Sequence, residues 1–295
     1  MIRNTLFPSL ILTMILIAGL SSCENEPITE EEPDTGTSSL SDTTMTDVAY
    51  GTDPRQVYDV YLPANRDANT PVILMIHGGA WRAGQKEDLN SYRDLIKTKW
   101  SNVAIVNMNY RLASNANDIH HEEIMEDIDA VVNHIATNQN NYHISNDIGI
   151  MGGSAGGQLA MIYAYRYNED ILCVGNIFGP SIISDWSWYN SANIWLGAYT
   201  GDILTEYVGQ PWDTTAYKAV SPYWNVDSTS QPLIAFHGNL DPIVPVYQSQ
   251  WMHGKLNSLS VTNEYHEYLA FHSFDAAQAD DVTDKLVEFF QEHME

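Results

Sequence analysis

The sequence predicts an α/β fold with a mostly parallel central sheet and helices on both of its faces. From about Met45 to the C-terminus, short β-rich apolar runs alternate with longer segments that carry apolar residues at helical spacing. Apolar residues make up 44% of the chain, and 8 Trp, 17 Tyr and 7 Phe add enough material for one large core. A fold of this class reaches about 250 residues as one unit. We therefore expect a single folded domain over residues 46–295.

Residues 1–22 have the layout of a secretory signal, because Arg3 precedes a mostly apolar run from Leu6 to Leu20. A retained transmembrane anchor is the alternative, but it needs about 20 uninterrupted apolar residues, and a proline and polar residues interrupt this run. Leu20-Ser21-Ser22-Cys23 resembles the lipobox of bacterial lipoproteins. That resemblance implies lipidation at Cys23 and an exported lipoprotein of the outer membrane, on its periplasmic or cell-surface side. Protease shaving of intact cells would distinguish the two sides.

Residues 23–45 are expected to form a flexible acidic tether. From Glu24 to Asp42 the chain has acidic residues, prolines and Ser, Thr or Gly but no basic residue, so it cannot bury enough apolar area to become ordered. The whole chain has 13 Lys plus Arg against 38 Asp plus Glu, a net charge of −25. This charge excludes a nucleic-acid binder that depends on phosphate contacts. Contact with a membrane is expected only through the lipid anchor. Two cysteines are too few for a disulfide scaffold.

The predicted elements of the folded part follow from these alternating patterns. The expected strands are 56–62, 71–76, 103–109, 148–151, 173–178, 232–236 and 262–269. The expected helices are 89–98, 122–135, 155–167, 246–256 and 279–293.

A segment between two late strands, residues 181–224, has no clear strand pattern. It contains ten aromatic residues: Trp186, Trp188, Tyr189, Trp195, Tyr199, Tyr207, Trp212, Tyr217, Tyr223 and Trp224. Long insertions at the carboxyl edge of such a sheet often line a ligand site. We interpret it as a cap-like insertion, with Trp186, Trp188 and Trp195, together with Trp81, as candidates for the substrate wall. The alternative is that these aromatic side chains form the insertion's own small core.

Gly152-Gly153-Ser154-Ala155-Gly156 follows a predicted strand and opens a predicted helix. This is the context of a G-x-S-x-G nucleophile elbow, in which the serine hydroxyl is exposed on a sharp, strained turn. The flanking glycines are needed because side chains there would collide with the strand and helix. Ser154 is therefore the candidate nucleophile, and a glycine-rich turn with a buried serine is the alternative.

His77-Gly78-Gly79-Ala80-Trp81 directly follows another apolar strand. Acyl transfer needs N–H donors aimed at the developing oxyanion, and a glycine run allows backbone amides to come that close. The expected donors are the amides of Gly79, Ala80 and Ala155, the last being the residue after the nucleophile. His77 is a poor candidate for the base, since at this position a histidine more often fixes the loop.

A serine nucleophile also needs a base and an orienting carboxylate, which in this kind of fold come after late strands in the order Ser, Asp or Glu, His. Asp241 follows the strand 232–236 and His272 follows the final strand. The other late histidines lie within predicted elements or end the last helix, so His272 is the better candidate. The predicted triad is Ser154, Asp241 and His272.

Metal catalysis is the competing enzyme class. His121-Glu122-Glu123-Ile124-Met125 begins like the H-E-x-x-H zinc motif, but Met125 stands where the second histidine is required. Residues 120–123 are better interpreted as an acidic helix start. We expect neither a metal nor any other cofactor.

Together these residues resemble the hormone-sensitive-lipase-like branch of the α/β-hydrolase superfamily, and more closely its bacterial acetyl-xylan and feruloyl esterases. The similarity runs from about Tyr58 to the C-terminus and includes Asn109-Tyr110-Arg111-Leu112, Ser221-Pro222 and residues 237–245 besides the motifs above. The resemblance implies that Ser154 is the nucleophile, His272 the general base and later acid, and Asp241 the carboxylate that orients it. Many relatives have a third glycine where this chain has Ala80.

The expected function is that of a serine carboxylic-ester hydrolase that acts through an acyl-enzyme. The expected substrates are small esters or acylated oligosaccharides and polysaccharides, with acetyl or feruloyl as the acyl group. A general short-chain carboxylesterase or lipase is one alternative, and a formamidase is another because of the similar His-Gly-Gly-x-Trp pattern. A non-catalytic glycan-binding lipoprotein is the alternative from a different class.

Overall fold

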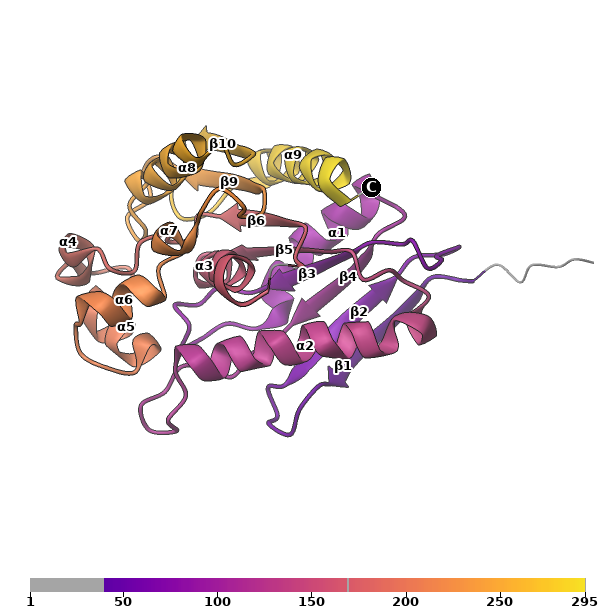
Figure 1. Cartoon of the computed structure of the whole chain (residues 1–295), viewed down its shortest axis with the longest axis horizontal. Coiled ribbons are helices and arrows are strands. Elements are labelled where there is room, and N and C mark those ends of the chain that lie inside the picture. Colours follow the sequence, from indigo (N-terminus) through magenta and orange to yellow (C-terminus); the bar gives the residue numbers. More distant parts are fainter. Residues whose placement is uncertain (1–39, 169, 295) are drawn as a thin grey trace, which may run out of the picture. The chain divides into compact units, whose positions relative to one another are not determined.

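The computed structural model describes residues 40–168 and 170–294. Within them the central sheet has the strand order β1-β2-β4-β3-β5-β6-β9-β10 (Figure 1). The strands are Thr43–Ala49 (β1), Val57–Leu62 (β2), Val72–Ile76 (β3), Ala104–Met108 (β4), Ile148–Gly153 (β5), Cys173–Ile177 (β6), Leu233–Gly238 (β9) and Asn263–Tyr268 (β10). The β1–β2 and β2–β4 pairs are antiparallel, and the other pairs are parallel. The sheet is therefore mostly parallel, as predicted.

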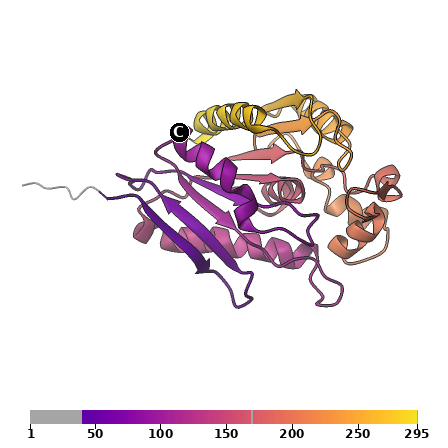
Figure 2. The ribbon, with the colours of Figure 1, turned by 180° about the vertical axis from the view of Figure 1, so that it is seen from behind.

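Helices cover both faces of this sheet (Figures 1 and 2). The helices outside the insertion are Asn90–Lys99 (α1), His121–Tyr142 (α2), Ala155–Ile162 (α3), Tyr247–Leu259 (α8) and Ala276–Met294 (α9). Lys86–Leu89 forms a 3-10 turn before α1, and Tyr163–Tyr167 continues α3 as a π-helical turn. The predicted helices are all present, with α2, α8 and α9 extending beyond their predicted ends.

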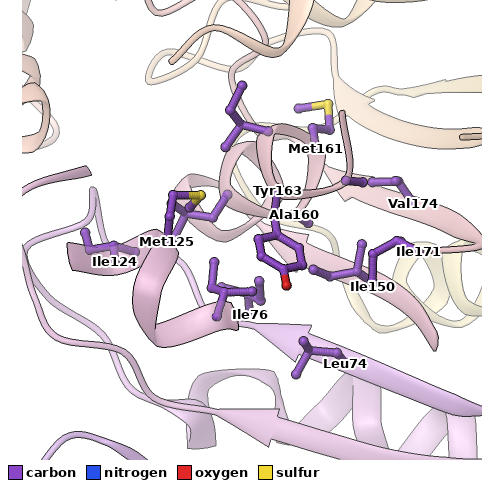
Figure 3. Close-up of a cluster of buried hydrophobic side chains, with 14 of the residues drawn as sticks. Leu74, Ile76, Ile124, Met125, Ile150, Ala160, Met161, Tyr163, Ile171 and Val174 are labelled. Atoms are coloured by element: carbon purple, nitrogen blue, oxygen red, sulfur yellow. The ribbon is translucent and has the colours of Figure 1, made fainter. Parts of the chain in front are cut away.

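Alternate residues of each buried strand supply two cores, one on each face. In β3, Leu74 and Ile76 pack on the face covered by α2, α3 and α8, whereas Ile73 and Met75 pack on the face covered by α1 and α9. Figure 3 shows part of the first core, where Ile124 and Met125 of α2 lie near residues of α3, β3 and β5. Because both faces of the parallel strands are buried, the sheet positions the loops at its carboxyl ends rigidly.

The folded part begins earlier than residue 46, which corrects the predicted end of the tether. Residues 43–45 belong to β1, where Thr43 pairs with Leu62. The Arg66 guanidinium also holds this segment, since its Nη1 donates to the carbonyl of Ser41 at 2.7 Å. Sequence patterning did not reveal β1 because it is an edge strand of polar Thr and Asp residues, and only Met45 and Val48 pack against the core.

The predicted signal peptide, Cys23 and tether residues up to 39 lie outside the described residues, so these assignments stay predictions. No helix in residues 40–168 or 170–294 has the length and apolar character needed to cross a membrane.

The predicted insertion folds mainly as short helices. They are Trp186–Tyr189 (α4), Thr200–Val208 (α5), Thr214–Ala219 (α6) and Pro222–Asn225 (α7), and Ala192–Asn193 (β7) pairs with Ala198–Tyr199 (β8) in a small hairpin. Trp188, Tyr207 and Tyr217 are buried. Tyr189 contacts the rings of both Trp212 and Tyr217. Much of the aromatic content therefore forms the insertion's own core, which was the alternative interpretation.

Candidate active site

Ser154 lies on a sharp turn between β5 and α3. Its backbone has φ 54° and ψ −123°, a strained conformation for an L residue. The turn fits only because glycines surround it: a Cβ on Gly156 would lie 2.0 Å from the carbonyl oxygen of Ile76, and one on Gly152 would lie 2.3 Å from the backbone of Gly156. The strand, turn and helix thus present the Ser154 hydroxyl above the carboxyl edge of the sheet.

His272 and Asp241 reach Ser154 from the loops that follow β10 and β9. His272 Nε2 lies 2.9 Å from Ser154 Oγ, and His272 Nδ1 lies 2.6 Å from Asp241 Oδ2. With Nδ1 protonated, the imidazole donates to the carboxylate and can accept the serine proton at Nε2. The three predicted residues come together in the geometry of a nucleophile, a general base and an orienting acid.

Asp241 is fixed by several donors. Its Oδ1 accepts hydrogen bonds from the backbone amides of Ile243 at 2.8 Å and Val244 at 3.0 Å. His237 Nε2 lies 3.2 Å from Oδ2. Burial alone would raise the pKa of Asp241, but the hydrogen bonds from His237 and His272 outweigh it and lower the pKa below its ordinary value. The carboxylate is therefore ionised and held in place at neutral pH.

His237 is a positioning residue that sequence reasoning did not identify. Its side chain is fully buried, and Nε2 also lies 3.0 Å from the carbonyl oxygen of Val244. Nδ1 lies 2.7 Å from the hydroxyl of Ser249, which can donate to it. Nε2 is then the protonated nitrogen and can donate to Asp241. The position of His237 in a strand excluded it as the base, and no sequence signal indicated this second role.

Three backbone amides lie beside Ser154: those of Gly79 and Ala80 in the loop after β3, and that of Ala155 at the start of α3. Ser154 lines one cavity with Gly79 and Ala80 and a second with Ala80 and Ala155. Within the described part of the chain, the amides of Gly79, Ala80 and Ala155 donate no hydrogen bond. They are therefore available to a bound oxyanion, which is the role predicted for them.

The loop after β3, residues 77–85, which we call the oxyanion loop after its predicted role, has an unusual backbone. Gly79, Ala80 and Trp81 have φ values of 111°, 52° and 60°. For the two non-glycine residues, this left-handed conformation costs about 1–3 kcal/mol each. The indole of Trp81 offsets this strain, because it is buried, stacks on Tyr207 at 4.4 Å between ring centroids and donates to Gln158 Oε1 at 2.9 Å.

Gln158 connects the oxyanion loop to the insertion. Its Oε1 also accepts from the Tyr207 hydroxyl of α5 at 3.0 Å, and its Nε2 donates to the carbonyl of Val220. Gln158 is therefore a second positioning residue that the sequence did not reveal, since a glutamine one turn into a helix carries no distinguishing pattern.

His77 is structural, as the sequence suggested. Its buried ring stacks on Tyr110 at 4.3 Å between centroids, Nδ1 lies 2.6 Å from the carbonyl oxygen of Gly78, and Arg55 Nη2 lies 3.2 Å from Nε2. Burial lowers the pKa of His77 to about 4. The neutral ring thus fixes the start of the oxyanion loop. The predicted acidic helix start is also observed, since Glu123 in α2 accepts from the amide of His120 at 2.8 Å.

Stability is expected to fall on mild acidification because of His77 and His121. Burial lowers the pKa of His121 to about 3, and its ring nitrogens face the hydroxyls of Tyr207 and Tyr167. Both rings are neutral when folded, but in the unfolded chain they take up protons below about pH 6.5. Their stabilisation is therefore complete above that pH and is lost progressively towards pH 4.

At pH 5 the expected loss is about 2 kcal/mol for each histidine, which lowers Tm by on the order of 10 °C. Thermal unfolding measured between pH 7.5 and 5 checks this. A His121→Gln variant should show a shallower slope of Tm against pH than the wild type. An equal slope in the two proteins would contradict the assignment.

Two cavities meet at Ser154. The larger is an open cleft of about 800 Å³ lined by His272 and by polar side chains from the rim, among them Arg82, Asp88, Tyr92 and Glu206. Arg82 and Glu206 form an ion pair at 3.3 Å between the oxyanion loop and α5. The smaller cavity, of about 20 Å³, is lined mainly by apolar side chains, including Trp81, Trp188, Ile203 and Leu204.

The four tryptophans proposed for the substrate wall divide into two groups. Trp81 and Trp188 are buried and line the small cavity, where the Trp188 indole donates to the carbonyl of Ile243. Trp186 and Trp195 line neither cavity at Ser154, which corrects their assignment. Trp186 instead packs on Tyr189 and Trp212 at the surface, and Trp195 is 65% exposed in the β7–β8 turn. Sequence alone did not show which face of the insertion points inward.

A family model described as BD-FAE matches residues 58–256. A kynurenine formamidase of Meyerozyma guilliermondii is 31% identical over 112 residues, covering 38% of this chain and 39% of that protein. The alignments cover between 9% and 63% of the lengths of the curated relatives that match.

Solved structures share the fold. A truncated carbohydrate esterase from gut microbiota superimposes with a TM-score of 0.70 at 20% identity, covering 85% of this chain and 96% of that one. An acetyl ester-xyloside bifunctional hydrolase from Caldicellulosiruptor lactoaceticus gives a TM-score of 0.63 at 20% identity, covering 82% of this chain and 90% of that one.

Proposed function

Because the chain belongs to the BD-FAE family, of the α/β-hydrolase type, we propose that it is a serine esterase that removes acetyl groups from carbohydrate hydroxyls. One observation carries this proposal. A small apolar cavity and a large cleft, whose mixed lining includes charged side chains such as Arg82 and Glu206, meet at Ser154, and His272 lines only the cleft. We therefore assign the acid half of the ester to the cavity and its alcohol half to the cleft.

The proposed reaction begins when His272 Nε2 takes the proton of Ser154 and Oγ attacks the ester carbonyl carbon. The amides of Gly79, Ala80 and Ala155 stabilise the oxyanion that forms. His272 then gives its proton to the leaving alkoxide, the C–O bond breaks, and an acyl-enzyme remains on Ser154. Water, deprotonated by His272, then attacks the acyl-enzyme; the bond between the acyl carbon and Ser154 Oγ breaks, His272 returns the proton to Oγ, and the carboxylic acid is released. The alcohol must lie on the His272 side, because that residue protonates it.

The small cavity supports acetyl as the acyl group. About 10–15 Å³ is enough for one water molecule, so 20 Å³ accommodates a group about the size of a methyl. Trp81, Trp188 and Leu204 are buried and packed, which leaves little room for a longer chain. Of the two acyl groups suggested by the sequence, acetyl fits this cavity, whereas a feruloyl group is far larger.

The large cleft supports a polyhydroxylated alcohol. Its rim presents the carboxylates of Asp88 and Glu206 and the guanidinium of Arg82, all of which can bond to hydroxyl groups. Burial raises the pKa of Tyr92 to about 12, so its hydroxyl stays neutral and can donate or accept. The carbohydrate esterase and the acetyl ester-xyloside hydrolase that share the fold agree with a sugar as the leaving group.

A substrate panel tests the proposal. We expect release of acetate from acetylated xylo-oligosaccharides, and a kcat/KM for 4-nitrophenyl acetate at least about tenfold above that for the butyrate ester, since each misfitting methylene costs roughly 1–3 kcal/mol. Methyl ferulate should be a poorer substrate still. Cleavage of simple esters without release of acetate from the sugars would instead indicate a general short-chain carboxylesterase.

Enlarging the small cavity should relax the acyl preference. Ile203 of α5 lines it and is 2% exposed, so Ile203→Ala should reduce the acetate-to-butyrate ratio of kcat/KM by about tenfold. Ile183→Ala is the matched control, because Ile183 is equally buried in the insertion but lines neither cavity. Both changes should cost about 2–5 kcal/mol of stability, and only the first should alter the ratio. A ratio that changes equally in both variants would contradict the assignment of the cavity.

Hydrolysis of a formamide is a second candidate. A formyl group is smaller than acetyl and fits the same cavity, and the relative from Meyerozyma guilliermondii is a kynurenine formamidase. N-formylkynurenine therefore belongs in the panel. Turnover of this amide above that of acetylated sugars would favour the second candidate over the first.

A further inference from the structure

A separate depression of about 330 Å³ lies on the surface where the insertion meets α8. It is lined by Ser184, Asp185, Trp186, Lys218, Trp224 and Trp251, among others. None of its lining residues takes part in either cavity at Ser154. The residues come from α4, α6, α7, α8 and the loop before α4, which gather at the end of the domain where the parallel strands have their carboxyl ends (Figures 1 and 2).

Three indole rings dominate this depression and remain accessible. Trp186 is 55% exposed, Trp224 is 49% exposed and Trp251 is 53% exposed. Large aromatic side chains are usually more buried than this, so three in one depression mark a site of interaction.

Each ring is also held by a neighbour. Trp186 stacks on Tyr189 at 5.5 Å between centroids, and Trp251 packs on Tyr247 at 4.6 Å. The Trp224 indole donates to Ser184 Oγ at 2.9 Å. The rings are therefore preorganised, and a ligand would lose less side-chain entropy on binding them.

The polar groups around the rings narrow the class of ligand. Asp185 and Lys218 contribute one charge of each sign, so the lining is neutral overall, and Ser184 and Ser187 contribute hydroxyls. Lys218 Nζ lies 4.3 Å from the centroid of the Trp224 ring, and Asp185 accepts from the amides of Ser187 and Trp188 and from the Tyr247 hydroxyl, so a ligand would share these two charged groups with the protein. Ile182 is the one aliphatic side chain in the lining, which disfavours an acyl chain or an amphipathic helix. The chain's net charge of −25 disfavours a polyanion.

A pyranose ring has the matching chemistry, because it presents C–H groups on its faces and hydroxyls around its edge. Aromatic rings offer flat apolar area for those faces, and the surrounding hydroxyl, carboxylate and ammonium groups can bond to the edge. We propose that this depression is a second carbohydrate-binding site, which holds a neutral segment of the polysaccharide whose acetyl groups are removed at Ser154. The identity of the polymer rests on the proposed function, whereas binding itself does not.

Binding is tested in the Ser154→Ala protein with unacetylated xylohexaose, cellohexaose and mannohexaose, by isothermal titration and tryptophan fluorescence. We expect at least one of the three to bind, and Trp224→Ala and Trp251→Ala each to weaken that binding by about tenfold. Trp195→Ala is the matched control, because Trp195 is an exposed tryptophan of the same insertion that lies outside this depression. It should leave the affinity unchanged.

A kinetic experiment with active Ser154 complements the binding test. Trp224→Ala and Trp251→Ala should raise KM for acetylated polymer with kcat unchanged, and should not alter hydrolysis of 4-nitrophenyl acetate. The second site is overturned if no hexaose binds, or if the Trp195→Ala control weakens binding as much as the other two. Failure of the proposed function has a different signature, since the hexaoses would bind but acetylated sugars would not be cleaved.

Discussion

Replacement of Ser154 with alanine is expected to lower kcat/KM for 4-nitrophenyl acetate by at least about 10⁴-fold. The reason is that Ser154 Oγ is the only nucleophilic atom within hydrogen-bonding distance of His272 Nε2 in the described residues. Without it no acyl-enzyme forms, and only binding and the oxyanion donors remain to assist attack by water. Steady-state kinetics on the purified variant measure the loss.

The fold should survive this change, because alanine adopts the backbone of Ser154 at no greater cost than serine. Tm should therefore stay within a few degrees of the wild type. Ser258→Ala is a matched control: Ser258 is exposed in α8, where its hydroxyl donates to the carbonyl of Lys255. Full activity is expected of the control. Appreciable esterase activity in folded Ser154→Ala would show that another residue is the nucleophile.

Asp241→Asn is expected to lower kcat by about 10⁴-fold while leaving KM nearly unchanged. The asparagine carbonyl can still accept from the amides of Ile243 and Val244, so the loop keeps its shape. Its amide group then faces His272 Nδ1, where a donor stands in place of an acceptor. His272 must then adopt the other tautomer, with unprotonated Nδ1 facing the asparagine and Nε2–H facing Ser154. In this form Nε2 cannot accept the serine proton, so the general base is lost.

The stability of this variant gives a second readout. Because the pKa of Asp241 is lowered in the folded protein, the carboxylate stabilises the fold above its unfolded pKa near 4, and that stabilisation is lost as the pH falls further. The Tm difference between wild type and Asp241→Asn should therefore shrink below about pH 4. Asp129→Asn is the control, since Asp129 accepts from Tyr163 away from Ser154, and its kcat should match the wild type. Retention of more than a tenth of kcat by Asp241→Asn would contradict the role of Asp241.

Much of the fold and the triad geometry follows from local sequence signals. Buried parallel strands are continuous apolar runs, as in β3 and β4, and such runs can be recognised without knowing their partners. Ser154 can be recognised as a nucleophile candidate from its flanking glycines, because the turn has no room for larger side chains there. Asp241 and His272 follow because late strands end beside Ser154 in any sheet of this order. These inferences depend only on the period of a strand and on the placement of loops.

The remaining features depend on tertiary contacts that leave no local signal. β1 is recognisable only through its pairing with β2. Gln158 acts through hydrogen bonds to Trp81, Tyr207 and Val220, all of which are far from it along the chain. His237 contacts Asp241 in the loop after its own strand and Ser249 in α8, and these contacts depend on how that loop and helix fold back. The aromatic residues of the insertion were identified as a group, but their division between the insertion's core, the small cavity and the outer surface depends on how four short helices pack. Composition does not determine that packing.

The two cavities at Ser154 share part of their walls, and this limits how the enzyme can change its substrate. Leu196 and Ile243 line both of them, whereas Ile203 lines only the small cavity and Tyr92 only the cleft. Under the proposed assignment of the acid to the small cavity and the alcohol to the cleft, mutations at Ile203 and Tyr92 offer independent routes by which acid and alcohol selectivity can diverge. A mutation at Leu196 or Ile243 changes both selectivities together. A homologue that evolves to accept a longer acyl chain through a mutation at Leu196 would therefore also change its alcohol specificity. Where the alcohol must stay the same, selection would disfavour that mutation.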